Sequence, residues 1–150
     1  VGISFFDRLQ GLKLADRLDL SWDDEVIGAL QRALGFPQAA QAIGDFANTI
    51  DDLDVFYDAS RLGQQPGNSD RVYRLMDANA REVFGNFSRK WAGRAPTGGI
   101  PDVIERVGDD GSVINTMTLY QSSTEGLPTI RIDGPFGNST SWREIRFGSW

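Results

Sequence analysis

Residues 93–101 have the sequence Gly-Arg-Ala-Pro-Thr-Gly-Gly-Ile-Pro, and they separate two parts of the chain that differ in hydrophobic periodicity. Their three glycines and two prolines interrupt any regular element. Before this stretch, apolar residues recur at the spacing of a helix, and after it they alternate with polar residues as in a strand. Helices followed by strands, without alternation of the two, predict an α+β fold.

Three helices are predicted on the N-terminal side, over residues 22–34, 38–62 and 70–92. The third is the most regular, because its apolar side chains keep a period of 3.6 residues from Val72 to Trp91. Its start is placed after Ser69, whose hydroxyl can cap the first turn. The residues of this helix expected in the main core are Val83, Phe84 and Phe87.

Antiparallel strands are predicted on the C-terminal side, over residues 102–107, 112–120, 128–133 and 141–147. The sequence Gly-Asp-Asp-Gly between the first two is typical of a hairpin turn. The complete prediction is a single domain over residues 1–150. It is helical over residues 1–92, its N-terminal two-thirds, and ends in a small antiparallel β-sheet of about four strands over residues 102–147.

The composition excludes several kinds of active site. The 150 residues include no His and no Cys. Imidazole and thiolate zinc sites, Ser-His-Asp triads and Cys nucleophiles are therefore excluded. Any catalysis depends on carboxylates, Arg, Lys, Tyr, hydroxyl groups or a borrowed cofactor, and for the function predicted below we expect neither a metal nor a cofactor. No apolar run reaches the ~20 residues of a membrane span, so we expect no membrane-spanning segment.

Charge is distributed unevenly along the chain, whose net charge is −6. Residues 1–60 contain 11 acidic and 4 basic residues, and residues 101–150 contain 7 acidic and 4 basic ones. Residues 61–100 have the opposite balance, with 7 basic and 3 acidic residues. The middle of the chain is therefore the part that is suited to a nucleic acid.

A basic stripe is expected on the third predicted helix. Arg71, Arg74 and Arg81 share one helical face opposite the apolar residues, and Lys90 lies further along. Guanidinium groups bind phosphate in a bidentate manner, so these four residues are candidates for contacts with a nucleic-acid backbone. The alternatives are a plain solvent-exposed face, or a surface that pairs with the acidic side chains of residues 51–58.

The last hairpin contains the candidate catalytic residues. Alternation places six side chains on its outer face: Thr129, Arg131, Asp133, Trp142, Glu144 and Arg146. Glu144 is the preferred general base, and the catalytic set is completed by Arg131, Asp133 and Arg146. Trp142 can stack on a base, and Thr129 is a further substrate contact. The alternative is an ordinary solvent face with cross-strand ion pairs.

The predicted layout places helices first and finishes in a small sheet. In this it resembles the C-terminal toxin domains of bacterial polymorphic toxins, including those of contact-dependent growth inhibition. The chain begins without Met, so it is interpreted as an excised domain or a processed product. The resemblance also rests on the two final strand segments, Thr-Ile-Arg-Ile-Asp-Gly at residues 129–134 and Trp-Arg-Glu-Ile-Arg-Phe at residues 142–147. It implies secretion or delivery from a cell surface, action in the cytoplasm of the target cell, and a cognate immunity protein.

Three functions remain open from the sequence. The first is a metal-independent ribonuclease toxin that acts on RNA, with transfer RNA as one candidate substrate. Its acidic net charge and its lack of a matching catalytic motif depart from the nucleases of this kind. The second is a non-catalytic, acidic protein-binding module of the immunity or accessory type. The third is a domain that binds a small ligand between its helices and its sheet.

Overall fold

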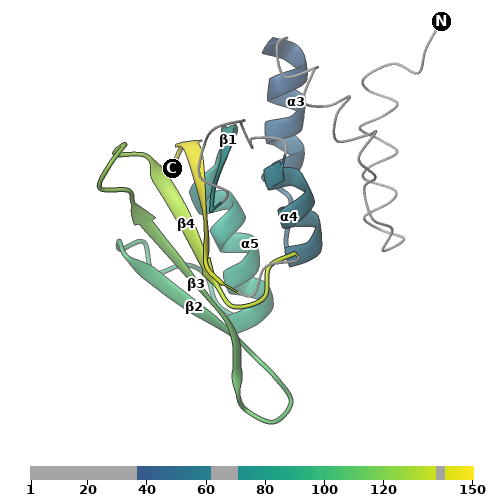
Figure 1. Ribbon diagram of the computed structural model, residues 1–150, viewed down its shortest axis with the longest axis vertical. Coiled ribbons are helices and arrows are strands. Elements are labelled where there is room, and N and C mark those ends of the chain that lie inside the picture. Colours follow the sequence, from purple (N-terminus) through teal and green to yellow (C-terminus); the bar gives the residue numbers. More distant parts are fainter. Residues whose placement is uncertain (1–36, 62–70, 138–140) are drawn as a thin grey trace, which may run out of the picture.

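The computed structural model describes residues 37–61, 71–137 and 141–150. Over these residues the chain is an α+β fold in which a strand precedes the longest helix (Figure 1). The elements in chain order are α3 (Pro37–Ala47), α4 (Leu53–Ser60), β1 (Val72–Asn79), α5 (Ala80–Ala92), β2 (Asp102–Val107), β3 (Val113–Gln121), β4 (Pro128–Asp133) and β5 (Arg143–Ser149). The predicted helix over residues 22–34 lies outside the described residues.

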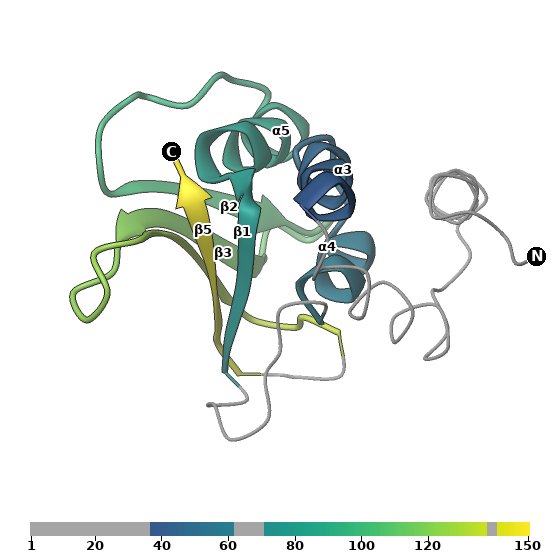
Figure 2. The ribbon, with the colours of Figure 1, turned by 90° about the horizontal axis from the view of Figure 1, so that it is seen from above.

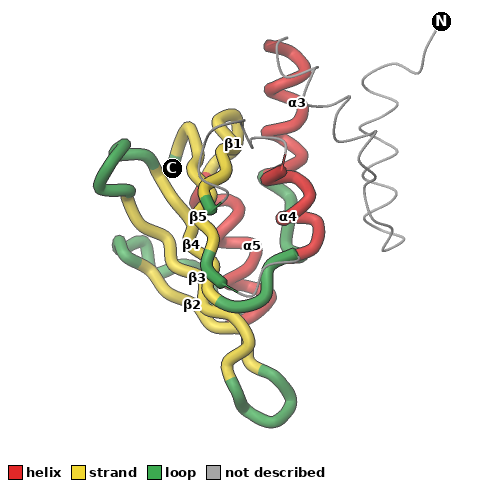
Figure 3. Tube along the Cα trace, viewed as in Figure 1, coloured by secondary structure: helices red, strands yellow, loops and turns green. Residues whose placement is uncertain are grey.

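The described strands form one mixed, five-stranded sheet in the order β1-β5-β4-β3-β2 (Figure 3). Strands β2 to β5 are antiparallel to their neighbours in sequence, whereas β1 pairs with β5 in parallel. Strand β1 is therefore one edge of the sheet and β2 is the other. The prediction of a helical first two-thirds followed by a four-stranded antiparallel sheet is wrong, because a strand before residue 92 joins the sheet and makes it mixed.

The error arises in residues 70–92, which the apolar period predicts as one helix. Strand β1 instead buries Tyr73 and Leu75 on one face of the sheet, with Arg74 between them on the other face. The helix begins only after Asn79, whose side chain accepts a hydrogen bond from the backbone N–H of Glu82 at 2.9 Å. Asn79 is thus the N-cap that the prediction assigned to Ser69.

The predicted helix over residues 38–62 is two helices. Helix α3 ends at Ala47, and α4 begins after Asp52, whose Oδ1 accepts hydrogen bonds from the backbone N–H groups of Asp54 (2.9 Å) and Val55 (3.3 Å). A carboxylate at this position satisfies two of the backbone donors that a helix start leaves open. Asp52 and Asp54 therefore lie at the favourable, positive end of α4 and not at the negative end of a longer helix.

The main core lies between the sheet and the helices, which Figure 2 shows on the same side of the sheet. Val83, Phe84 and Phe87 of α5 are fully buried there, as predicted. Phe56 of α4 connects the layers, because its ring centroid lies 5.7 Å from that of Phe87 and 6.4 Å from that of Phe147 on β5. We call the sheet face that meets this core the inner face.

The opposite sheet face, called the outer face below, is the one on which no described helix packs (Figure 2). The strands of the fold therefore present one face to an apolar core and the alternate residues to the outside. Across the described part of the chain, no helix is both long enough and apolar enough to cross a membrane.

Candidate functional site

The outer face brings together polar side chains from four neighbouring strands. The registers place Arg74 of β1 beside Arg146 of β5, and Arg146 beside Thr129 of β4. One step along the sheet, Glu144 of β5 lies beside Arg131 of β4. Paired residues in a sheet point to the same face, so Thr129, Arg131, Glu144 and Arg146 lie on one face of the sheet, as predicted.

Glu144 lies at the centre of this group. Its Oε1 accepts a hydrogen bond of 2.5 Å from the hydroxyl of Tyr120 on β3, and its Oε2 lies 3.6 Å from Nη2 of Arg146. Its side chain is only 16% exposed. Burial, and then the hydrogen bond to Glu144, raise the pKa of Tyr120, so this hydroxyl keeps its proton and positions the carboxylate.

Arg146 is the most enclosed cation of the group, with a side chain that is 10% exposed. Its Nη1 donates to Glu125, and its Nη2 donates to Thr124 Oγ1 at 3.2 Å. Arg74 on β1 donates to the same oxygen of Glu125, so one carboxylate oxygen connects two guanidinium groups. Thr129 lies beside Arg146 but is fully buried, which removes it from the accessible surface.

Arg131 forms a separate pair with Asp133 two residues along β4. Its Nε and Nη2 donate to the carboxylate over distances of 3.0–3.2 Å, and these hydrogen bonds raise the pKa of Arg131. The guanidinium carbon also lies 4.7 Å from the ring centroid of Trp142, while that of Arg71 lies 5.0 Å from the same ring. Trp142 therefore already serves as a cation–π partner for two arginines.

The predicted basic stripe does not exist as one surface, because its residues belong to different elements. Arg71 precedes β1 and Arg74 belongs to it, and both join the outer face. Arg81 and Lys90 belong to α5 on the other side of the sheet. There Arg81 lies 5.4 Å from the Trp150 ring centroid, and Lys90 forms an ion pair with Asp51 at 3.8 Å.

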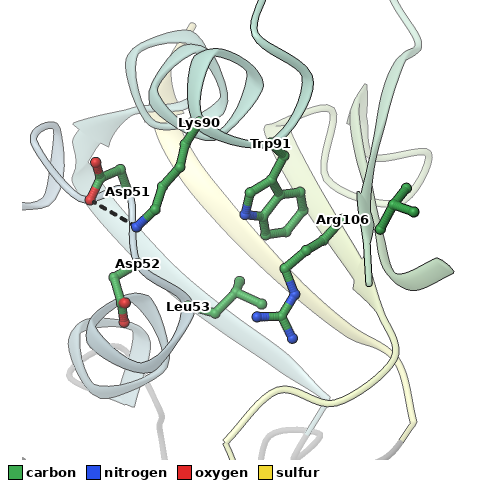
Figure 4. Close-up of a pocket in the computed structure, with 7 residues that line it drawn as sticks. Asp51, Asp52, Leu53, Lys90, Trp91 and Arg106 are labelled. Atoms are coloured by element: carbon green, nitrogen blue, oxygen red, sulfur yellow. Dashed lines mark ion pairs between the residues drawn. The ribbon is translucent and has the colours of Figure 1, made fainter. Parts of the chain in front are cut away.

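A separate hollow lies on the helix side of the sheet. Figure 4 shows Lys90 pointing toward Asp51 on one side of it, with Arg106 beside Trp91 on the other. Its volume is about 280 Å³, and its lining comes from the start of α4, the end of α5 and the end of β2. The lining contains two cations and two carboxylates and none of the outer-face residues.

Sequence reasoning missed three contributors to the outer face. Tyr120 could have been found, because Thr116, Thr118 and Tyr120 alternate with the apolar residues of the predicted third strand. Thr124 and Glu125 lie in the turn between β3 and β4. A turn has no regular alternation of apolar and polar residues from which the orientation of its side chains could be predicted. The position of Thr124 and Glu125 is set by the return of the chain onto the outer face.

The arrangement can accept a proton at Glu144 and can stabilise negative charge through Arg131 and Arg146, which lie beside it. Among the described residues, no group of three His, Cys, Asp or Glu side chains is placed to hold a metal ion. Comparison of the chain with protein-family models, with curated proteins and with solved structures gave no match.

Proposed function

We propose that the chain is a metal-independent ribonuclease domain whose active site is the outer face of the sheet. One observation carries this proposal: the carboxylate of Glu144 lies between the Tyr120 hydroxyl, at 2.5 Å, and the guanidinium of Arg146, at 3.6 Å. A carboxylate held in place by a neutral donor and next to fixed cations is suited to remove a proton while negative charge develops close by.

The proposed reaction uses the 2′-hydroxyl of RNA as the nucleophile. Glu144 takes the proton of this hydroxyl, and the 2′-oxygen bonds to the adjacent phosphorus. The bond from phosphorus to the 5′-oxygen breaks, and the departing oxygen takes a proton from water, while Glu144 returns its proton to the hydroxide that remains. The products are a 2′,3′-cyclic phosphate and a 5′-hydroxyl end, and no redox or metal-bound step is involved.

The arginines have distinct roles in this proposal. Arg146 and Arg131 flank Glu144 and would stabilise the charge that develops on the phosphoryl oxygens. Asp133 holds Arg131 in a bidentate pair, so it acts as a positioning residue. Arg71 and Arg74 lie at the β1 side of the group and would contact neighbouring phosphates of the RNA chain.

The wider proposal is that this domain acts as a toxin in bacteria and is neutralised by an immunity protein. It is supported by the three arginines that the outer face gathers on neighbouring strands, Arg74, Arg131 and Arg146. A partner that presents carboxylates to this face would block the proposed site through charge complementarity. Delivery into a target cell and action on its RNA in the cytoplasm belong to the same proposal.

The test combines growth, RNA integrity and substrate chemistry. The domain is expressed in bacteria under tight control, and the expected result is rapid growth arrest with cleaved RNA. With the purified domain, we expect cleavage that persists in a metal chelator and that stops when the nucleotide at the cut carries a 2′-deoxyribose. Cleavage of the deoxy substrate, or cleavage that the chelator abolishes, would contradict the mechanism.

A domain that neither arrests growth nor cleaves RNA in any form would instead be a binding module. The ion-pair network of the outer face would then be the solvent face of a sheet or a protein contact. Coexpression with a second protein separates these outcomes. An immunity-type module should protect cells from a coexpressed toxin, whereas cells that express a toxin domain should grow only when an immunity protein is coexpressed.

A further inference from the structure

Two guanidinium groups lie side by side at the β1–β5 edge of the outer face. Arg74 and Arg146 are direct partners in the parallel register, although like charges in such positions repel. Both donate to Oε1 of Glu125, which lies in the turn between β3 and β4. The two cations are thus fixed on neighbouring strands of the sheet, while the anion between them belongs to a turn.

The surroundings of Arg146 indicate a position built around an anion. Its side chain is only 10% exposed, and the side chain of Glu125 is 34% exposed. The Thr124 hydroxyl accepts from Nη2 of Arg146 and can itself donate to an added oxygen. The Nε atom of Arg146 is buried and has no hydrogen-bond partner. The cation is therefore held deeply in place, whereas the carboxylate reaches it from the accessible side.

We propose that Arg74 and Arg146 form a phosphate-binding subsite, and that Glu125 occupies it as an intramolecular competitor for the phosphate. This inference rests on the proposed function in one respect, which is that the phosphate belongs to a nucleic-acid chain. A phosphate group fits this position better than a single carboxylate oxygen, because separate oxygens can accept from each guanidinium. Entry of the phosphate releases Glu125 to solvent.

This subsite adjoins the proposed base. Arg146 contacts Glu125 through Nη1 and approaches Oε2 of Glu144 through Nη2, so one guanidinium borders both positions. A phosphate between Arg74 and Arg146 would therefore lie next to Glu144. Displacement of Glu125 then becomes the step that opens the site to RNA.

The test measures phosphate affinity in Glu125→Gln, which removes the competing charge and keeps the shape of the side chain. The matched control is Glu105→Gln, the same change at an exposed position on the outer face of β2. Binding of inorganic phosphate is followed by calorimetry at fixed, low ionic strength. We expect affinity to rise by about tenfold or more in Glu125→Gln, because a charge-assisted contact no longer has to be displaced, and to stay unchanged in Glu105→Gln.

A second pair of variants locates the bound phosphate. In the Glu125→Gln background, Arg74→Gln should abolish the gain, whereas Arg81→Gln on α5 should retain it. If Glu125→Gln does not fold in phosphate-free buffer, Glu125→Asp is used, which keeps the charge on a shorter side chain. We then expect a smaller rise in phosphate affinity and a rise in thermal stability as phosphate is added. Unchanged affinity in both Glu125 variants would overturn the proposal.

Two further arms separate this inference from the proposed function. A short DNA oligonucleotide, which has no 2′-hydroxyl to react, should show the same gain in affinity as inorganic phosphate. A gain for inorganic phosphate alone would overturn the assignment to a nucleic-acid chain. If the gain occurs without any RNA cleavage by the wild-type domain, the subsite stands and the ribonuclease proposal fails. If RNA is cleaved at a rate that Glu125→Gln does not change, and phosphate affinity is also unchanged, the ribonuclease proposal stands and the subsite proposal fails.

Discussion

The two faces of the sheet are made from alternate residues of the same strands, yet the inner face is mainly apolar and the outer face mainly polar. The inner face presents Leu75, Ile132 and Phe147 to a core that three described helices cover. The outer face presents charged and hydroxyl side chains joined in a network of ion pairs and hydrogen bonds. This contrast suggests that stability and chemistry can be changed separately, because a substitution on one face leaves the other face in place.

The largest effect on stability is expected from the inner side. Phe84 is fully buried on α5, so Phe84→Ala should lower the free energy of unfolding by about 3–5 kcal/mol. Val103→Ala is the control, because Val103 is an apolar residue on β2 that is 48% exposed. The control should change stability by no more than ~0.5 kcal/mol in denaturant unfolding. Equal losses in the two variants would remove the distinction between the faces.

A smaller effect is expected where β1 ends and α5 begins. Asn79→Ala removes the acceptor for the backbone N–H of Glu82 and should cost about 1 kcal/mol. Asn79→Asp keeps an acceptor and adds charge at the positive end of the helix, so its stability should stay close to that of the wild type. If both variants unfold at the same denaturant concentration as the wild type, the helix does not begin at this residue.

The smallest effect concerns the pH dependence of stability. The pKa of Tyr120 is raised above its ordinary value of 10.0, first by burial and then by Glu144. At a pH above the ordinary pKa of tyrosine but below the raised pKa of Tyr120, the unfolded chain loses the tyrosine proton while the folded chain keeps it. The free energy of unfolding should therefore fall as the pH rises above about 10. Unfolding in denaturant at about pH 8 and about pH 11 measures this fall.

Tyr120→Phe should show a shallower fall over the same range. Part of the fall should remain, because burial also raises the pKa of Tyr57. An identical pH dependence in the wild type and in Tyr120→Phe would show that Tyr120 is not held neutral by the outer face.

The C-terminal half of the sheet could be predicted because its sequence alternates between apolar and polar residues. The same alternation predicted which side chains of β4 and β5 share the outer face, from Thr129 to Arg146. Alternation predicts the face of the sheet to which a side chain points, but not how exposed that side chain is. Thr129 is consequently on the predicted face and yet fully buried. Trp142 contacts Arg131 of the same predicted face, but it also contacts Arg71, which the sequence placed on a helix.

Strand β1 could not be predicted from the same kind of pattern. Val72, Leu75 and Met76 fit a helical period, and the capping residue Asn79 divides that pattern at a point where the apolar spacing continues. What makes these residues a strand is the free edge of β5, with which they pair in parallel. That partner lies about 70 residues further along the chain, so the secondary structure of residues 72–79 is set by tertiary pairing and not by the local sequence.

The turn that contains Glu125 illustrates a further limit of sequence reasoning. Its contacts with Arg74 and Arg146 join three segments that are far apart in the chain. Nothing in the local composition of residues 122–127 indicates that this turn folds over charged side chains of β1 and β5. The residues proposed here to control access to the site are therefore visible only in the fold.

We propose above that Glu144 on the outer face is the base of a ribonuclease. The most direct test compares RNA cleavage by the wild type, by Glu144→Gln and by Glu105→Gln, after unfolding measurements have shown that all three are folded. We predict that Glu144→Gln loses about 100-fold to 10,000-fold in rate, while Glu105→Gln, which makes the same change of charge on the same face, cleaves like the wild type. Cleavage by Glu144→Gln at the wild-type rate, or equal losses in both variants, would contradict the claim.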